Sequence, residues 1–138
     1  MFSNILVAVD GSESSKRAFE KSIFLSQKCD ASLHVLHVVA CELGGDSAIV
    51  FDLLDEVKAN AANMLKSYKS EADKNGIQIE IMIHQGDPAQ MIIELSKKNK
   101  YDLIIMGTRG RTAFQELLLG SVSLKVIHHA SCPVMVVQ

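Results

Sequence analysis

The residues that most clearly suggest a ligand site lie in the segment "GTRGRTAFQELLLGS", which runs from residue 107 to residue 121. Gly107 and Gly110 lack a Cβ, so they permit a positive φ and let main-chain N–H groups approach a ligand closely. Gly120 and Ser121 stand at the start of a predicted helix, where unpaired N–H groups favour a phosphate and a hydroxyl adds a donor. The segment predicts a phosphate site, although glycines between a strand and a helix are more often turn residues.

Four polar residues bear on this prediction. Asp10 follows the apolar run "NILVAV", and its carboxylate could bind a ribose hydroxyl if that run is a strand beside the phosphate site. Arg109 and Arg111 flank Gly110, and the sequence leaves open whether they contact phosphate oxygens or are solvated. Ser121 lacks the G-x-S-x-G surroundings of a nucleophile, so we interpret its hydroxyl as a donor and predict no catalytic residue.

The histidines and cysteines do not have the spacing of a metal site. His128 and His129 fall in the last turn of a predicted helix, where the helix dipole favours imidazole, so capping is the simpler role. His34, His37 and His84 lack thiol or carboxylate partners at the spacing of metal ligands. The three cysteines contain no C-x-x-C pair. We therefore predict no metal held by direct protein ligands.

Length and composition indicate one soluble domain spanning residues 1–138. The chain has 138 residues and is 48% hydrophobic, which is enough for one core. Its 14 basic and 16 acidic residues give a formal net charge of −2, which argues against a nucleic-acid or acidic-membrane partner. No apolar run approaches the ~20 residues of a membrane span, and the N-terminus lacks the pattern of a leader, so we expect a cytoplasmic protein.

Strand and helix patterns alternate along the whole chain. Apolar runs predict strands, and apolar residues at helical spacing between them predict helices, with Ser12 or Ser14 as the first N-cap. The third strand alternates isoleucine with other residues, as expected for a strand at a sheet edge. The predicted strands cover residues 4–9, 31–40, 77–84, 101–107 and 134–137, and the predicted helices cover residues 12–29, 47–75, 86–100 and 118–130.

This order predicts an α/β fold with a doubly wound, Rossmann-like parallel sheet of five strands and helices on both faces. With the third strand at an edge, the simplest strand order is 3-2-1-4-5. The winding then reverses between the first and fourth strands, and ligands of such sheets bind at the carboxyl ends of the strands beside that reversal. Asp10 and the segment beginning at Gly107 follow those two ends.

The spacing Gly107-x2-Gly110-x9-Gly120-Ser121, between "DLIIM" and "HHASCPVMVV", resembles the nucleotide-binding signature of the universal stress protein family. "ILVAVDGSESSKRA", "LHVLHVV" and "GDPAQMIIELSKK" resemble further segments of that family, so the resemblance covers essentially the whole chain. It implies ATP or AMP as the ligand, with Mg²⁺ as an ion that could bridge the phosphates.

The resemblance also implies contacts with the nucleotide for particular residues. The implied adenine and ribose contacts are Asp10, the main chain of Ala8 and Val9, and Val38. Met106 would line the pocket. The ribose and phosphate contacts would be Gly107, Gly110, Gly120 and Ser121, with helix-terminal groups of Val122 and Ser123 and, in the open interpretation above, Arg109.

We therefore expect an adenine-nucleotide-binding regulatory protein of the stress response. One alternative is a slow ATPase or phosphotransferase, although the sequence contains no Walker lysine motif, kinase loop or G-x-G-x-x-G. Another is a dimeric interaction module with a vestigial pocket. The last strand, formed by Val134, Met135, Val136 and Val137, is apolar on both faces and ends the winding, so we predict a homodimer through its open edge, which the resemblance also implies.

Overall fold

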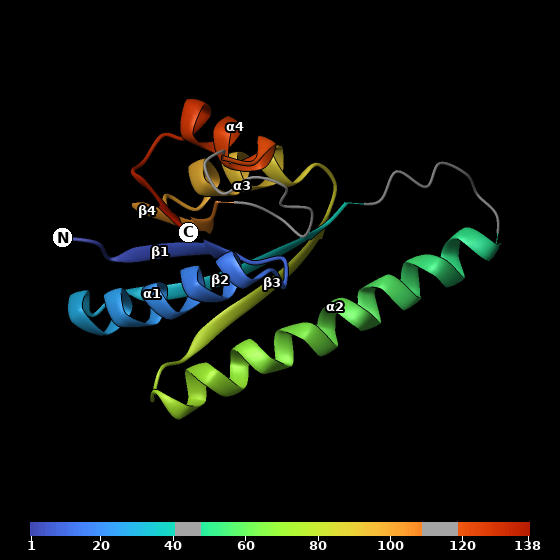
Figure 1. Ribbon diagram of the computed structural model, residues 1–138, viewed down its shortest axis with the longest axis horizontal. Coiled ribbons are helices and arrows are strands. Elements are labelled where there is room, and N and C mark those ends of the chain that lie inside the picture. The colour runs from blue at the N-terminus through green and yellow to red at the C-terminus, as the bar shows by residue number, and fades with distance from the viewer. Residues whose placement is uncertain (41–47, 109–118) are drawn as a thin grey trace.

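The computed structural model describes residues 1–40, 48–108 and 119–138, and for residues 48–54 it describes the main chain alone. The described residues form a five-stranded parallel sheet with the strand order β3-β2-β1-β4-β5, as predicted (Figure 1). The strands are β1 (Asn4–Ala8), β2 (Ser32–Val39), β3 (Ile79–Gln85), β4 (Leu103–Gly107) and β5 (Val134–Val137). The helices are α1 (Glu13–Cys29), α2 (Ala48–Lys74), α3 (Pro88–Lys98) and α4 (Ser121–His129).

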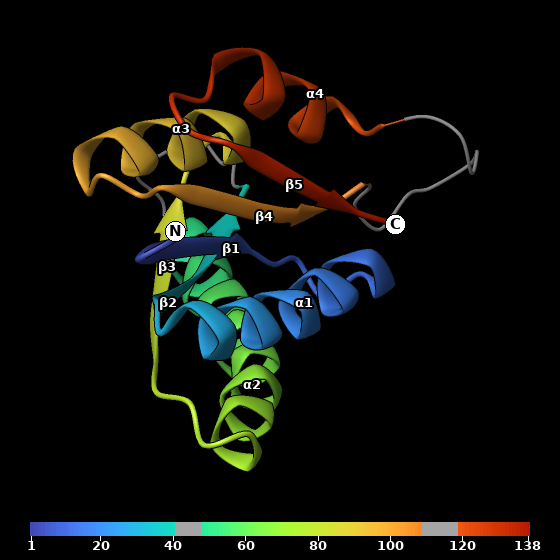
Figure 2. The same cartoon turned by 90° about the vertical axis from the view of Figure 1, so that its left-hand side faces the viewer.

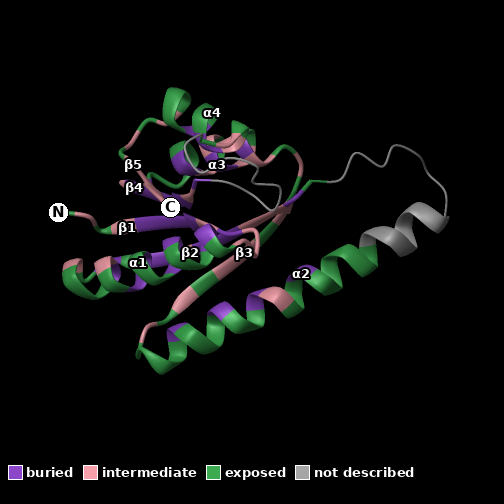
Figure 3. Cartoon of the chain, viewed as in Figure 1, coloured by how far each residue is buried: buried purple, intermediate pink, exposed green. Residues whose placement is uncertain are grey.

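The helices cover the two faces of the sheet in pairs. Figure 2 shows α1 and α2 on one side of the sheet and α3 and α4 on the other. Successive side chains of a strand point to opposite faces, so neighbours in β1 enter different cores: Val7 packs in the cluster of α1 and α2, and Leu6 in the cluster of α3 and α4. The central strands are therefore buried on both sides, as Figure 3 shows, and their continuous apolar runs are explained.

Helix ends follow the capping residues that the sequence offers. The Ser12 hydroxyl accepts a hydrogen bond from the Ser15 N–H (3.3 Å) and caps α1, while Asp87 caps α3 by accepting from the Gln90 N–H (2.9 Å). Gly76 follows α2 with a φ of 69°, a conformation that glycine adopts without strain. No helix in the described part of the chain is long and apolar enough to cross a membrane.

The edge strand β3 is confirmed, but its alternation is less regular than predicted. Ile79 and Ile81 pack against the cluster between the sheet and helices α1 and α2, whereas Met82 packs against the cluster on the opposite face. Ile83, in the carboxyl half of the strand, is 38% exposed. The predicted period of two assumed one buried face along the whole strand. In the structure, each face of β3 is instead covered along only part of the length of the strand.

Candidate functional site

The strand order brings the two predicted halves of the site together. Ala8 of β1 lies opposite Met106 of β4, so the carboxyl ends of these strands are neighbours at the point where the winding reverses. The Gly120 N–H donates to the Thr108 carbonyl (2.7 Å), which ties the start of α4 to the end of β4. Arg109 and Gly110 lie outside the described residues, so their predicted contacts with a ligand stay predictions.

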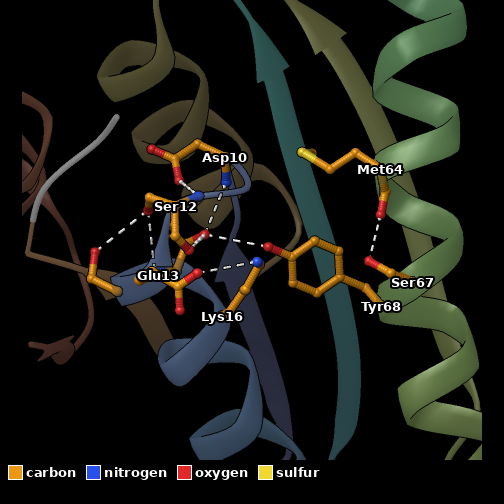
Figure 4. A network of polar contacts seen from close by, with 9 residues as sticks. Asp10, Ser12, Glu13, Lys16, Met64, Ser67 and Tyr68 are labelled. Carbon is orange, nitrogen blue, oxygen red and sulfur yellow. Dashed lines mark hydrogen bonds and ion pairs between the residues drawn. The ribbon is translucent and has the colours of Figure 1, made fainter. Parts of the chain in front are cut away.

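The turn between β1 and α1 holds Asp10 in a fixed conformation. One carboxylate oxygen accepts the Ser12 N–H (2.9 Å), and Gly11 between them has a φ of 82°, which a residue with a side chain rarely adopts. Figure 4 shows the second carboxylate oxygen pointing away from Ser12. Asp10 is half-buried. The turn therefore presents a negatively charged acceptor at the carboxyl end of β1 before any ligand binds.

Gly107 needs a bare backbone for a reason that the sequence did not reveal. A Cβ at this position would lie 2.8 Å from the Ser14 carbonyl carbon and 2.8 Å from the Ser15 amide nitrogen, both of which belong to the first turn of α1. Gly107 does not use the positive φ that glycine permits; the described glycines with positive φ are Gly11, Gly76 and Gly86. Its role in the described structure is to let the end of β4 pack directly on α1.

The N-terminus of α4 supplies main-chain donors beside this packing contact. Gly120 precedes the helix in an extended conformation (φ −66°, ψ 163°), and the Leu124 N–H makes the first helical bond, to the Gly120 carbonyl (3.0 Å). The amides of Ser121, Val122 and Ser123 come before that bond, so they have no partner within the helix. Amides of this kind, together with the positive end of the helix dipole, are able to bind an anion.

Ser123 has a structural role that sequence reasoning missed. Its side chain is 2% exposed, and its hydroxyl lies 2.9 Å from the Gly107 carbonyl and 3.2 Å from the Thr108 carbonyl, to which it donates. Together with the Gly120 N–H, this hydroxyl fixes α4 on the end of β4. The predicted ligand contact of Ser123 is therefore restricted to its main chain.

The main-chain groups of Val9, for which the resemblance implies a contact with adenine, already have hydrogen-bond partners within the protein. The Val9 N–H donates to the Leu36 carbonyl (2.9 Å), and the Val9 carbonyl lies 2.7 Å from Nδ1 of His37. A carbonyl only accepts, so His37 must carry its proton on Nδ1. Ala8 and Val38 are half-buried and pack against the cluster that contains Met106. The hydrogen bond from His37 is a contact that no motif in the sequence indicated.

A second unpredicted contact joins α2 to the turn that holds Asp10. The Ser15 hydroxyl donates to the Ser12 carbonyl (3.0 Å), accepts the Asp10 N–H (3.3 Å) and lies 3.3 Å from the Tyr68 hydroxyl (Figure 4). Burial raises the pKa of Tyr68, and the negative charge of Asp10 raises it further. The sequence offers one signal for this contact: Tyr68 falls at helical spacing with Ala61, Leu65 and Ala72, which predicts burial, and a buried tyrosine hydroxyl usually has a partner.

Within the described residues, no group of three or more histidine, cysteine, aspartate or glutamate side chains could hold a metal ion. His128 and His129 lie in the last turn of α4, where we predicted them. His34 instead contacts Tyr101, whose hydroxyl lies 2.8 Å from Nδ1 of the imidazole. This pair lies at the amino ends of the strands, whereas the candidate site lies at their carboxyl ends.

Comparison with known proteins gives one consistent result. The model of the universal stress protein family matches residues 1–138. Universal stress protein YxiE of Bacillus subtilis is 33% identical over 148 residues, which cover 100% of both chains. Universal stress protein UspA from Lactobacillus plantarum has a TM-score of 0.90 at 27% identity and covers 99% of this chain and 98% of that chain. A universal stress protein family protein from Arabidopsis thaliana with AMP bound has a TM-score of 0.69 at 27% identity, covering 98% and 90%.

Proposed function

Because the chain belongs to the universal stress protein family, we propose that it binds an adenine nucleotide, ATP or AMP, and acts as a regulatory protein of the stress response in the cytoplasm. The structure of the Arabidopsis thaliana relative with AMP bound supports the choice of ligand. The family membership supports the regulatory role, and the residues of the candidate site support a phosphate-containing ligand.

The observation that carries the proposal is the arrangement of two different polar groups at one reversal of the sheet. The Asp10 carboxylate follows β1, and the N-terminal amides of α4 are tied to the end of the neighbouring strand β4 through Gly120 and Thr108. A carboxylate suits ribose hydroxyls, and helix-terminal amides suit phosphates. One nucleotide has both kinds of group.

We assign the nucleoside end of the ligand to Asp10, Ala8 and Val38, with Met106 as part of the pocket wall. The phosphates are assigned to the amides of Ser121, Val122 and Ser123. Gly107 lets the end of β4 pack on α1, and the Gly120 N–H ties the start of α4 to the end of β4. The contacts predicted for Arg109 and Gly110 belong to the same proposal. Mg²⁺, as part of the same proposal, would be held by the phosphates of the ligand and would neutralise their charge, without direct protein ligands.

The proposal is tested by identifying what the purified protein retains. Denaturing the protein, followed by chromatography and mass analysis of the released small molecules, should yield an adenine nucleotide, and calorimetric titration of the emptied protein should show binding of ATP or AMP. A protein that retains no nucleotide and binds neither one would favour the interaction module with a vestigial pocket. Steady-state phosphate release from ATP separates the regulatory protein from the slow ATPase: we expect no sustained release.

We also propose that the protein is a homodimer that pairs through β5. This strand contacts β4 on one side, and all four of its residues are half-buried although it lies at the end of the sheet. Apolar side chains along an unpaired edge support an association with a second copy.

A further inference from the structure

The hydroxyl group of Ser15 has a complete set of hydrogen-bond partners. A serine hydroxyl has one proton to donate and two lone pairs that accept. The proton goes to the Ser12 carbonyl (3.0 Å), and the Asp10 N–H occupies one lone pair (3.3 Å). The remaining neighbour, the Tyr68 hydroxyl at 3.3 Å, must therefore be a donor to the second lone pair. This count therefore makes Tyr68 the donor and Ser15 the acceptor of the hydrogen bond between them.

The Tyr68 side chain is held in the orientation that this donation requires. It is 4% exposed, and its ring packs edge-on against Phe19 of α1, with the centroids 4.9 Å apart and the planes at 86°. Because burial raises the pKa of Tyr68, the hydroxyl keeps its proton throughout the neutral pH range. Tyr68 comes from α2, so it links this helix to the turn between β1 and α1.

We propose that Tyr68 is a positioning residue of the candidate nucleotide site: its hydroxyl proton, donated to Ser15, fixes the turn that carries Asp10. This inference rests on the proposed function. Ser15 bonds both to the Asp10 N–H and to the Ser12 carbonyl, so its position sets both sides of the turn in which Asp10 accepts the Ser12 N–H. The placement of α2 thereby affects the affinity for the ligand although Tyr68 does not touch it.

The test compares two variants that each remove one buried tyrosine hydroxyl. Tyr68→Phe removes the donor to Ser15 and keeps the ring. Tyr101→Phe removes the hydroxyl of a residue that is also 4% exposed, and the partner of that hydroxyl is His34, at the opposite end of the strands. We expect both to lower the stability. Only Tyr68→Phe should raise the dissociation constants, about threefold to tenfold, measured calorimetrically with adenosine, AMP and ATP. The factor should be similar for the three ligands because Asp10 is assigned to their shared nucleoside.

The possible failures of this test have different meanings. If the wild-type protein binds none of the three ligands, the proposed function fails and the inference falls with it. If the wild type binds them and Tyr68→Phe binds them equally well, the inference is wrong and the proposed function stands. Equal losses of affinity in Tyr68→Phe and Tyr101→Phe would also overturn it, because they would reflect general destabilisation.

Ser15→Ala removes the same link from its other end and serves if Tyr68→Phe does not fold. We expect it to weaken binding by at least the same factor, and the double variant should show no loss beyond that of Ser15→Ala alone. Additive losses would overturn the route through Ser15. Amide hydrogen exchange without ligand gives an independent measurement. Compared with the wild type, the exchange rate of the Asp10 N–H should be higher in Tyr68→Phe and the same in Tyr101→Phe.

Discussion

At the level of single residues, Asp10 has one observed contact and one proposed role, and mutation can separate the two. Its carboxylate accepts the Ser12 N–H and is also assigned to the nucleoside of the ligand. Asp10→Ala should weaken binding of ATP and adenosine alike by ~1.5–3 kcal/mol, the range for a charge-assisted hydrogen bond, as titration calorimetry would measure. Asp10→Asn keeps an oxygen for Ser12 without the charge, so it should preserve the turn and lose part of the affinity. Unchanged affinity in Asp10→Ala would leave this carboxylate with the turn alone.

Gly107 offers a prediction about packing that needs no ligand. In Gly107→Ala the new Cβ would press on the main chain of Ser14 and Ser15, which can yield only if the whole first turn of α1 moves. We expect the free energy of unfolding without nucleotide to fall by about 1–3 kcal/mol, the usual cost of overpacking. Urea denaturation measures it. A variant of normal stability that no longer binds nucleotide would show that the ligand, not the helix, requires glycine here.

The two buried tyrosines set an alkaline limit on stability. Burial raises the pKa of Tyr68 and of Tyr101 above the ordinary value of 10.0, so the folded chain keeps both protons at a pH where the unfolded chain has lost them. Their effect on stability is constant below about pH 10, and the free energy of unfolding falls as the pH rises beyond it. Denaturation at stepwise higher pH should show this fall, and Tyr68→Phe should reduce its slope. Tyrosinate absorbance that rises at the ordinary pH in the still-folded protein would contradict the prediction.

Residue roles divide clearly into those that the sequence could predict and those that it could not. The positions of Asp10 after a strand and of Gly120 before a helix could be predicted, because apolar periodicity shows where a strand ends and a helix begins. The hydroxyls of Ser15 and Ser123 were not, since each bonds to an atom whose position depends on how α1 or α4 packs. The reason for glycine at position 107 was hidden for the same cause: the clash involves a helix that begins far earlier in the chain.

At the level of elements, the N-terminus of α4 is the part of the site that a single substitution can test. Gly120 has a φ of −66°, which valine also adopts, so Gly120→Val should fold. Its branched side chain would crowd a phosphate bound at the amides that follow. A ligand at a hundredfold excess over its Kd stabilises the folded state by ~2.7 kcal/mol, so the wild type should melt at a higher temperature with ATP and Mg²⁺. Gly120→Val should lose most of this rise.

The control for this experiment is Lys98→Ala, on the exposed end of α3, which should keep the full rise in melting temperature. An equal response of Gly120→Val and the wild type would show that the glycine serves the connection between β4 and α4 and not the ligand.

The elements themselves were predictable where local sequence decides them. The helix predicted for residues 47–75 is observed as α2 over Ala48–Lys74, and every strand end lies within two residues of its predicted position. The irregular burial of β3 was not predictable, because it depends on how far along the strand each helical layer reaches. Ile83 has the same phase in the alternation as Ile81, and the packing of the layers distinguishes them: Ile81 packs against the core, whereas Ile83 is 38% exposed.

At the level of the whole molecule, the proposed homodimer depends on the outer edge of β5. The Ile104 N–H donates to the Pro133 carbonyl and the Thr108 N–H donates to the Val137 carbonyl. Along a parallel ladder alternate residues face the partner strand, so the main chain of Val136 faces outward. Val136→Pro removes that outward N–H without breaking a bond to β4, and light scattering at micromolar concentration should show a dimer for the wild type and a monomer for the variant.

Val136→Ala is the matched control, because it shortens the same side chain and retains the N–H, so it should remain largely dimeric. A monomeric wild type, or a dimer that tolerates Val136→Pro, would rule out pairing through this edge.

The parallel order of the strands also determines how the molecule would carry a mechanical load. Met1 leads into the amino end of β1 and Gln138 follows the carboxyl end of β5, with β4 paired to both strands between them (Figure 2). Traction applied to Met1 and Gln138 would draw β1 and β5 in opposite directions along their own axes. The hydrogen bonds of both ladders would then share the force at the same moment instead of rupturing one after another. A pull on its two ends therefore loads the sheet in shear, and a sheet loaded in shear withstands a larger force than one whose hydrogen bonds rupture one after another.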